Sequence, residues 1–192
     1  MKKTAFLGAF FLVFPFIILT WLEEVFSKGE MLFSFFGHLL SLVPGLPGSY
    51  LRSAFYYATL RKCAWNFHIG FGSFFPHRGT EIGSNVTIGA YCIIGIATIG
   101  AETIIASRCS IPSGKTQHFD NEGKMTRKFT PSRVVIGKNV WIGEGSIIMD
   151  DVGDDTIIGA GSVLAQKAPS SCLMAGVPAR PRNSCSSSSH VI

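Results

Sequence analysis

The sequence has little charge for its size. Only 15% of its 192 residues are Asp, Glu, Lys or Arg, whereas 47% are hydrophobic. A chain of this composition has enough apolar side chains to bury, which excludes disorder for most of it. The formal net charge is +5, and the basic residues are too dispersed to indicate nucleic-acid binding. We therefore expect a folded protein without a nucleic-acid partner.

The sequence also lacks paired cysteines. Its five cysteines are widely spaced, and none of them forms a CxxC pair. An odd number of isolated cysteines indicates neither a zinc site nor a disulfide scaffold. We therefore expect no metal centre and reduced thiols at every cysteine, namely Cys63, Cys92, Cys109, Cys172 and Cys185.

No charged residue occurs between Thr4 and Leu22, a run of nineteen residues that follows Lys2 and Lys3. At about 1.5 Å per residue, a helix of this length crosses a hydrocarbon core of about 30 Å. A secretory signal peptide is the alternative, but its apolar region is usually shorter and ends in small residues at a cleavage site. Thr20-Trp21-Leu22-Glu23 has no such motif, so a membrane segment is favoured.

A second apolar run extends from Met31 to Pro47. All acidic residues before residue 81 lie between the two runs, and basic residues follow the second. The acidic residues are Glu23, Glu24 and Glu30, and the basic residues are Arg52, Arg61 and Lys62. The positive-inside rule favours a hairpin with both basic ends in the cytoplasm. In the alternative, the second run is an interfacial helix or packs on the folded domain. We expect residues 1–62 to attach the chain to the cytoplasmic membrane, with the remainder facing the cytoplasm.

From Ile82 onward, an aliphatic residue recurs with a period of six, usually followed by Gly. One residue is missing between Ile94 and Ile99, and two are missing from a twelve-residue step between Ile148 and Ile158. The recurring positions are Ile82, Ile88, Ile94, Ile99, Ile105, Ile111, Ile136, Ile142, Ile148, Ile158 and Leu164. The residue two positions before each of them is always small or β-branched. Since side chains alternate along a strand, both residues of such a pair point to the same side. We interpret the glycines as corner residues with positive φ.

This pattern predicts an all-β domain in which short strands stack as the coils of a parallel β-helix. We place this domain at residues 63–183, followed by a Ser-rich tail at 184–192. The repeat stops between Ile111 and Ile136, and residues 113–133 must therefore protrude as a loop. A long excursion from a regular scaffold is usually functional.

The loop contains His118, with Asp120 two residues later. Histidine has a pKa near neutrality and is the usual base for removing a hydroxyl proton. A carboxylate on the same side of an extended segment orients such an imidazole. His118 and Asp120 are therefore the candidate catalytic residues.

The motifs around and after this loop carry a family resemblance. They are Gln117-His-Phe-Asp120, Val135-Ile-Gly-Lys-Asn-Val-Trp-Ile-Gly-Glu144, Ile158-Gly-Ala-Gly-Ser162 and Ala175-Gly-Val-Pro-Ala-Arg180. Over residues 66–182 the chain resembles the hexapeptide-repeat acyltransferases, in the galactoside, maltose and xenobiotic acetyltransferase branch, and above all the acetyltransferases of surface-polysaccharide gene clusters. The resemblance implies a left-handed β-helix, a homotrimer with active sites between subunits, and a catalytic base at His118.

The resemblance also implies acetyl-CoA as co-substrate and O-acetylation as the reaction. The residues that match the family's acetyl-CoA-binding motifs are Trp141, Glu144, Ala160, Lys167, Arg180 and Arg182. Lys167 departs from the family pattern because it is displaced to a position after Ala165-Gln166. An arginine matches phosphate geometry, and small residues admit a thin pantetheine arm. Trp141 has a second interpretation, which is outward packing against a neighbouring subunit.

The acceptor does not follow from the resemblance, because the family's N-terminal acceptor-binding region has no counterpart here. The apolar N-terminus favours a saccharide or lipid-linked glycan over a small soluble acceptor such as an amino acid or an antibiotic. Two other classes remain as alternatives. A γ-type carbonic anhydrase needs three converging histidines, for which His68, His77 and His118 are the candidates. A catalytically inactive assembly protein needs no basic loop.

Overall fold

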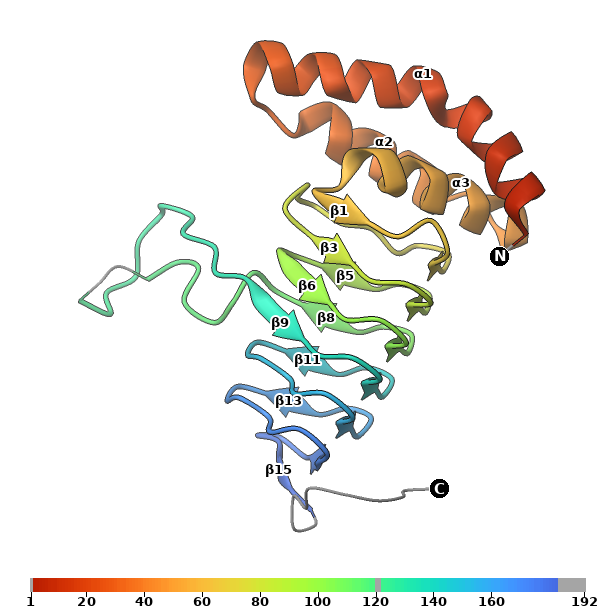
Figure 1. Cartoon of the computed structure of the whole chain (residues 1–192). Helices are drawn as coiled ribbons and strands as arrows, with labels where there is room; N and C mark the ends of the chain where they lie inside the picture. Colours follow the sequence, from red (N-terminus) through yellow and green to blue (C-terminus); the bar gives the residue numbers. More distant parts are fainter. Residues whose placement is uncertain (1, 120–121, 183–192) are drawn as a thin grey trace.

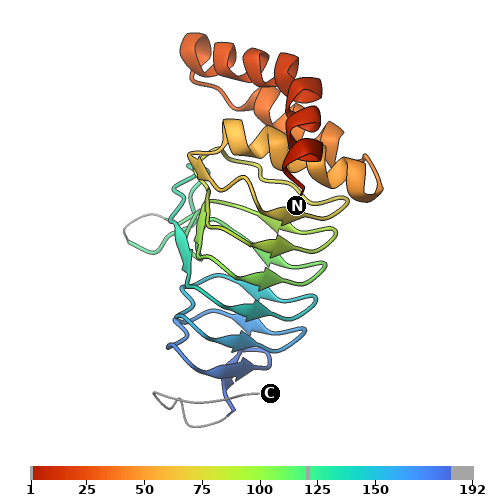
Figure 2. The same ribbon diagram turned by 45° about the vertical axis from the view of Figure 1, so that its right-hand side comes forward.

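The computed structural model describes residues 2–119 and 122–182. A stack of flat coils forms a prism, three helices cover its N-terminal end, and one loop projects from its side (Figure 1). The described residues begin in the helical cap and end, at residue 182, at the other end of the stack (Figure 2). The predicted Ser-rich tail, Cys185 and Asp120 lie outside the described residues.

The strands are two or three residues long and form the three sides of the prism. The first sheet has the order β1-β3-β6-β9, the second β15-β14-β12-β10-β7-β4-β2, and the third β13-β11-β8-β5. The strands are β1 Lys62–Cys63, β2 His68–Ile69, β3 Glu81–Ile82, β4 Thr87–Ile88, β5 Ile93–Ile94, β6 Ala97–Ile99, β7 Ile104–Ile105, β8 Ser110–Ile111, β9 Val134–Ile136, β10 Trp141–Ile142, β11 Ile147–Ile148, β12 Ile157–Ile158, β13 Val163–Leu164, β14 Leu173–Ala175 and β15 Arg180–Pro181. All pairings are parallel except that of β14 with β15. The parallel β-helix is confirmed.

The register of the coils places the periodic aliphatic residues inside the prism. In the second sheet, Ile88 pairs with Ile105, Ile105 with Ile142, and Ile142 with Ile158. All four of these side chains are fully buried. The small residues two positions earlier are buried as well, at all eleven positions: Thr80, Val86, Cys92, Ala97, Thr103, Cys109, Val134, Val140, Ser146, Thr156 and Ser162. The pairing of a large with a small inward residue is therefore confirmed.

The hydroxyl groups among these small residues bond to the neighbouring coil. Thr80 Oγ1 donates to the carbonyl oxygen of Gly95 at 2.8 Å, and Thr103 Oγ1 donates to that of Gly137 at 2.9 Å. A buried hydroxyl without a partner destabilises a fold, so these bonds allow Thr and Ser in the core.

The predicted role of the repeat glycines is wrong. Residues such as Gly100 and Gly143 do not have positive φ; the left-handed corner positions lie further on, for example at Asn85 and Asn139. A Cβ at Gly143 would lie 2.5 Å from the backbone nitrogen of Ala160 in the next coil, and one at Gly100 would lie 2.4 Å from the carbonyl oxygen of Gly137. Glycine is required here because consecutive coils approach each other too closely for a side chain.

The helical cap comprises α1 (Lys3–Ser27), α2 (Met31–Ser41) and α3 (Gly45–Thr59). Within the described residues, α1 is the one helix long and apolar enough to cross a membrane. With 11 residues at about 1.5 Å each, α2 is too short for a hydrocarbon core of about 30 Å. Its Phe33 is buried and stacks on Phe55 of α3 with the ring centroids 6.0 Å apart. The structure thus agrees with the alternative in which the second apolar run packs on the folded domain.

Helix α3 joins the cap to the first coil through Arg52, whose side chain is buried. The guanidinium group donates to the carbonyl oxygens of Ile69 at 3.1 Å, Leu40 at 3.0 Å and Val43 at 2.7 Å. One side chain therefore bonds to the coil, to α2 and to the segment between α2 and α3.

Replacing Arg52 with Ala is expected to reduce the free energy of unfolding of the cap by about 4 kcal/mol or more, because three hydrogen bonds are lost and each hydrogen bond to a charged group contributes about 1.5–3 kcal/mol. Limited proteolysis at increasing urea concentration measures this loss. Arg61→Ala is the control, since the side chain of Arg61 is 68% exposed. Equal protease resistance of the two variants would contradict the role of Arg52.

The cysteines are not all reduced. Cys63, Cys92 and Cys109 are free, and the last two are buried at inward positions. Cys172 is disulfide-bonded, so the expectation of reduced thiols is wrong at this position. A disulfide depends on a Cα separation of about 4.4–6.8 Å in space, which the spacing of cysteines in a sequence does not reveal.

Candidate active site

The loop of residues 113–133 leaves the prism at the corner between the third and first sheets, here called the loop edge (Figure 1). Its base is closed by the Ser132 N–H, which donates to the Ser113 carbonyl at 3.0 Å. Further out, the Thr126 N–H donates to the His118 carbonyl at 2.7 Å, and Phe119 and Met125 form an antiparallel bridge. These bonds hold the backbone of His118 in a folded excursion.

Arg133 fixes the point where the loop returns to the prism. Its guanidinium donates to the carbonyl oxygen of Gly79 at 2.7 Å and to that of Ala97 at 3.2 Å, and it lies 3.8 Å from the Glu81 carboxylate. It therefore contacts two different coils. The planar fork of donors makes arginine suited to this kind of bridging.

The His118 side chain is exposed, and its ring centroid lies 5.9 Å from that of Phe129 in the same loop. On its other side, Phe129 stacks on His77 at 5.3 Å. His77 in turn hydrogen-bonds through Nδ1 to a carboxylate oxygen of Glu30 at 2.7 Å. The loop with the candidate base is thus in contact with the segment between α1 and α2. The proposed pairing of Asp120 with His118 stays a prediction.

Most of the candidate cofactor residues lie elsewhere, along the corner between the second and third sheets, here called the Glu144 edge. The Glu144 carboxylate accepts a hydrogen bond from Arg108 of the preceding coil at 2.5 Å, and its carbonyl accepts one from Gly161 at 2.8 Å. Ala160 is exposed beside it in the next coil. Trp141, on the adjoining strand β10, is 48% exposed. A small side chain therefore lies next to a charged one on this edge.

Arg180 and Arg182 lie at the C-terminal end of the same edge. Arg180 is on β15, paired with Ala175, and is exposed; one of its guanidinium nitrogens donates to the carbonyl of Ala179 at 3.1 Å. The backbone N–H of Arg182 donates to the carbonyl of Leu173 at 2.9 Å. Two cations are thus available at one end of the Glu144 edge.

Lys167 is separate from the other five, because it follows β13 and lies on the loop edge. There it interacts with Asp150, which also accepts a hydrogen bond from Lys115 at 2.6 Å. Burial raises the pKa of Asp150, but the bonds from Lys115 and from the Asp151 N–H, together with the nearby lysine charges, lower it below its usual value. The structure therefore groups Lys167 with the loop and not with Glu144.

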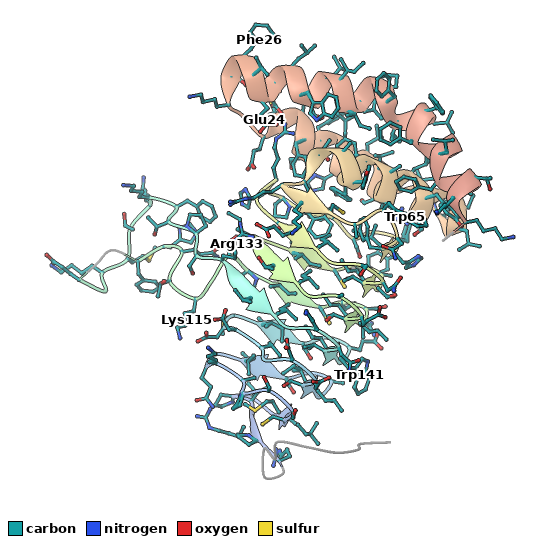
Figure 3. All side chains as sticks on the ribbon, in the orientation of Figure 1. Glu24, Phe26, Trp65, Lys115, Arg133 and Trp141 are labelled. Atoms are coloured by element: carbon teal, nitrogen blue, oxygen red, sulfur yellow. The ribbon has the colours of Figure 1, made fainter. Side chains whose placement is uncertain are left out.

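One chain does not unite the two halves of the candidate site. Lys115, at the base of the loop, and Trp141 lie on opposite sides of the prism (Figure 3). Within one chain, the candidate base and most of the candidate cofactor residues therefore lie on different edges of the prism.

The three histidines that a metal enzyme would require are held in different contexts. His68 hydrogen-bonds through Nδ1 to Ser49 at 2.8 Å, and burial together with the Arg52 charge lowers its pKa. His77 is bonded to Glu30, and His118 lies in the loop. Within residues 2–119 and 122–182, no three His, Cys, Asp or Glu side chains are grouped as metal ligands.

Several contacts around the loop were not predicted from the sequence, in which His77 was considered only as a metal ligand. His77, Arg78 and Phe129 connect the cap with the loop, and Arg108 bonds to Glu144. The cluster of acids between the apolar runs was the available clue, but we interpreted it as a topology signal alone. Its partners are 47 or more residues away in the chain, where no local pattern identifies them.

Known proteins share both sequence and fold with this chain. The family described as bacterial transferase hexapeptide (six repeats) matches residues 133–166. A protein of Escherichia coli (strain K12) named as a lipopolysaccharide biosynthesis O-acetyl transferase, WbbJ, is 33% identical over 43% of this chain and 47% of its own length. The galactoside O-acetyltransferase of the same organism is 30% identical over 65% of this chain and 62% of its own. The chain thus spans about half the length of the curated relatives it matches.

A solved structure shows the same architecture. It is a hexapeptide-repeat containing acetyltransferase from Vibrio cholerae O1 biovar eltor, complexed with acetyl coenzyme A. It matches with a TM-score of 0.60 and 21% identity, covering 85% of this chain and 92% of its own. The β-helix of this chain is accordingly of the left-handed type.

Proposed function

Since this chain belongs to the hexapeptide-repeat transferase family, we propose that it is an O-acetyltransferase that moves an acetyl group from acetyl-CoA to a hydroxyl of a saccharide or lipid-linked glycan. The observation that carries this proposal is the loop with His118, which leaves an otherwise regular β-helix at the loop edge. The names of the two relatives, which are both O-acetyl transferases, support the same reaction.

In the proposed reaction, the acceptor hydroxyl oxygen attacks the thioester carbonyl carbon while His118 removes the hydroxyl proton. The C–S bond then breaks, and the CoA sulfur takes up the proton from the imidazolium as it leaves. A histidine suits both steps because its pKa lies near neutral pH. Asp120 is proposed to orient the imidazole. The exposure of His118 leaves its ring accessible to a substrate.

The cofactor is proposed to lie along the Glu144 edge of a neighbouring subunit. Ala160 leaves room there for a pantetheine arm, Trp141 flanks it, and Arg180 and Arg182 are positioned for phosphate groups. The acetyl coenzyme A bound to the Vibrio cholerae protein of the same fold is consistent with this cofactor. Lys167, on the loop edge, would reach it only from the subunit that contributes His118.

A homotrimer is proposed because the prism exposes apolar side chains on both faces that meet at the Glu144 edge. On the second sheet Ile104 and Trp141 are each 48% exposed, and on the third sheet Ile93 is 48% and Ile147 39% exposed. Contact with a second copy would bury these side chains. In a closed ring of three, every subunit has a neighbour on both of its contact surfaces. It would also bring each loop edge next to a Glu144 edge.

We propose that the cap attaches the enzyme to the cytoplasmic face of the membrane. One face of α1 is buried within the cap. On this helix, Trp21 Nε1 donates to the Ala58 carbonyl of α3 at 3.0 Å. The opposite face exposes apolar side chains, including Phe11 at 69%, Val25 at 73% and Phe26 at 83%. With one face packed on protein and the other apolar, α1 is proposed to lie along the membrane surface. Acetyl-CoA is a cytosolic cofactor, and the enzyme is therefore proposed to lie on the cytoplasmic side of the membrane.

The double variant Phe11→Glu/Leu22→Glu is expected to lose binding to phospholipid vesicles, measured by flotation. The two residues are eleven positions apart and so share one face of α1. Met125→Glu is the control, because Met125 is 84% exposed and belongs to the loop of residues 113–133 and not to α1. An in-plane helix is released by alkaline carbonate. Resistance of the wild type to carbonate would show that α1 spans the membrane instead.

The function is tested by incubating the purified chain with radiolabelled acetyl-CoA and fractionated lipid-linked glycans. Transfer of label into the glycan fraction, with free CoA released in equal amount, is the expected result. Label in added serine or in an aminoglycoside, but in no glycan, would identify a small soluble acceptor. Absence of transfer to any acceptor would favour an inactive assembly protein.

A further inference from the structure

A pocket of about 660 Å³ lies between the segment that joins α1 to α2 and the first coil of the prism. It is lined by Glu24, Lys28, Gly29, Glu30 and Arg78. Its volume is within the range of about 300–1,000 Å³ that small-molecule sites occupy. Glu24 lies at the C-terminal end of α1, on the side from which the loop projects (Figure 3).

Arg78 in the wall of this pocket lacks hydrogen-bond partners that its burial demands. The residue is 8% exposed, and its Nη2 donates to the Thr20 carbonyl at 2.9 Å and to Glu23 at 3.0 Å. Its buried Nε and Nη1 have no partner. Glu24 is 3.9 Å from Nη1, too far for a hydrogen bond. Because Nη1 is fully buried, it would donate to a ligand oxygen only after the Arg78 side chain turns toward Glu24, and that oxygen could then donate to Glu24 in turn.

The pocket is connected to the candidate base by direct contacts within one chain. The Glu30 carboxylate accepts hydrogen bonds from His77 Nδ1 at 2.7 Å and from the Arg78 backbone N–H at 2.9 Å. His77 stacks on Phe129, whose ring is also next to that of His118. The rings of His77 and Phe129 thus lie between the pocket and His118, with centroid steps of 5.3 Å and 5.9 Å. A general base must be within hydrogen-bond reach of the proton that it removes, so a sugar ring in the pocket is not the ring whose hydroxyl His118 deprotonates.

We propose that this pocket binds a sugar ring of the acceptor glycan other than the ring that is acetylated. This inference rests on the proposed function. Carboxylates that accept from hydroxyl groups and cations that donate to them are both present, at Glu24, Glu30, Lys28 and Arg78. A neutral polyol uses both kinds of group. A phosphate is disfavoured, because the acidic residues of the pocket and the adjacent Glu23 outnumber the two cations.

The position of the pocket fits an acceptor attached to a lipid. Glu24 is followed directly by Val25 and Phe26, which are 73% and 83% exposed on the apolar face of α1. A saccharide in the pocket would keep its lipid portion next to the face that we propose to lie on the membrane. The cap would then combine attachment with acceptor binding.

Binding is tested by saturation-transfer difference NMR on the full chain in lipid nanodiscs, since glucoside and maltoside detergents would compete. The probes are the methyl glycosides of glucose, galactose, rhamnose and N-acetylglucosamine. At least one of them should bind, and Glu24→Gln and Lys28→Met should each weaken it roughly tenfold or more, because hydrogen bonds to charged groups are lost. Glu102→Gln is the matched control, since Glu102 is exposed on the prism outside the pocket.

The inference is overturned if no glycoside binds to the wild type, if both variants bind as the wild type does, or if inorganic phosphate displaces the glycoside. Its failure is distinguishable from failure of the proposed function. Acetyl transfer with an acceptor KM that is unchanged in both variants would leave the function and reject the pocket. Glycoside binding that depends on Glu24 and Lys28, in a chain without acetyl transfer, would support the pocket and reject the proposed function.

Discussion

Replacing His118 with Ala should lower kcat for acetyl transfer about 10²–10⁴-fold, because a general base typically contributes that much to the rate. The KM for acetyl-CoA should change little, since the proposed cofactor residues lie on the Glu144 edge and not in the loop. Steady-state kinetics with acetyl-CoA and a glycan acceptor measure both constants. The loop backbone is held by the carbonyl of His118, which the substitution retains.

Two further variants make this experiment specific. Arg180→Ala should show the opposite pattern, with a raised KM for acetyl-CoA and a smaller change in kcat. Asp120→Asn should fall between the wild type and His118→Ala if Asp120 orients the imidazole. Retention of more than roughly a tenth of the wild-type kcat by His118→Ala, well short of the loss expected for a base, would rule out His118.

Mixed trimers of two inactive variants should regain activity. His118→Ala removes the base, and Ala160→Trp fills the Glu144 edge at an exposed position. If each active site takes its loop from one subunit and its Glu144 edge from the next, about one site in three of every mixed trimer combines two intact halves. Co-expression with two different affinity tags, followed by tandem purification and an assay, measures this recovery.

Each variant alone and the double variant co-expressed with itself are the controls, and all should stay inactive. Analytical ultracentrifugation should show trimers in every sample. The proposed arrangement is wrong if purified mixed trimers remain as inactive as the single variants. The site would then lie within one chain, and the separation of Lys115 from Trp141 (Figure 3) would require a large movement of the loop.

The sequence predicted the prism well because the repeat is local. An aliphatic residue recurs every six residues, with a small partner two positions earlier, and this pattern involves only residues that are close in the chain. Burial at all eleven partner positions confirmed it. The reason for the glycines was not accessible in the same way. Whether Gly143 avoids a clash with Ala160 or adopts positive φ depends on the next coil.

The cap was the part in which sequence reasoning was least complete. The hydropathy of residues 4–22 predicted a long apolar helix, and α1 is that helix. Hydropathy does not distinguish an apolar face that meets lipid from one that packs on protein. Helix α2 packs on protein because it contacts Phe55 and Arg52 of α3. The apolar pattern of the sequence did not identify α3 as a separate helix.

For the candidate site, the sequence by itself determined the chemistry that is available: a histidine in an excursion from the repeat, small residues at fixed offsets, and arginines after the last coil. Only the tertiary structure decided which of them share an edge. It placed Lys167 with the loop, Glu144 with Ala160, and the acids between α1 and α2 against Arg78 and His77. The physical reason is that the repeat fixes the position of a residue along a coil, whereas contacts between the cap, the loop and the prism join residues far apart in the chain.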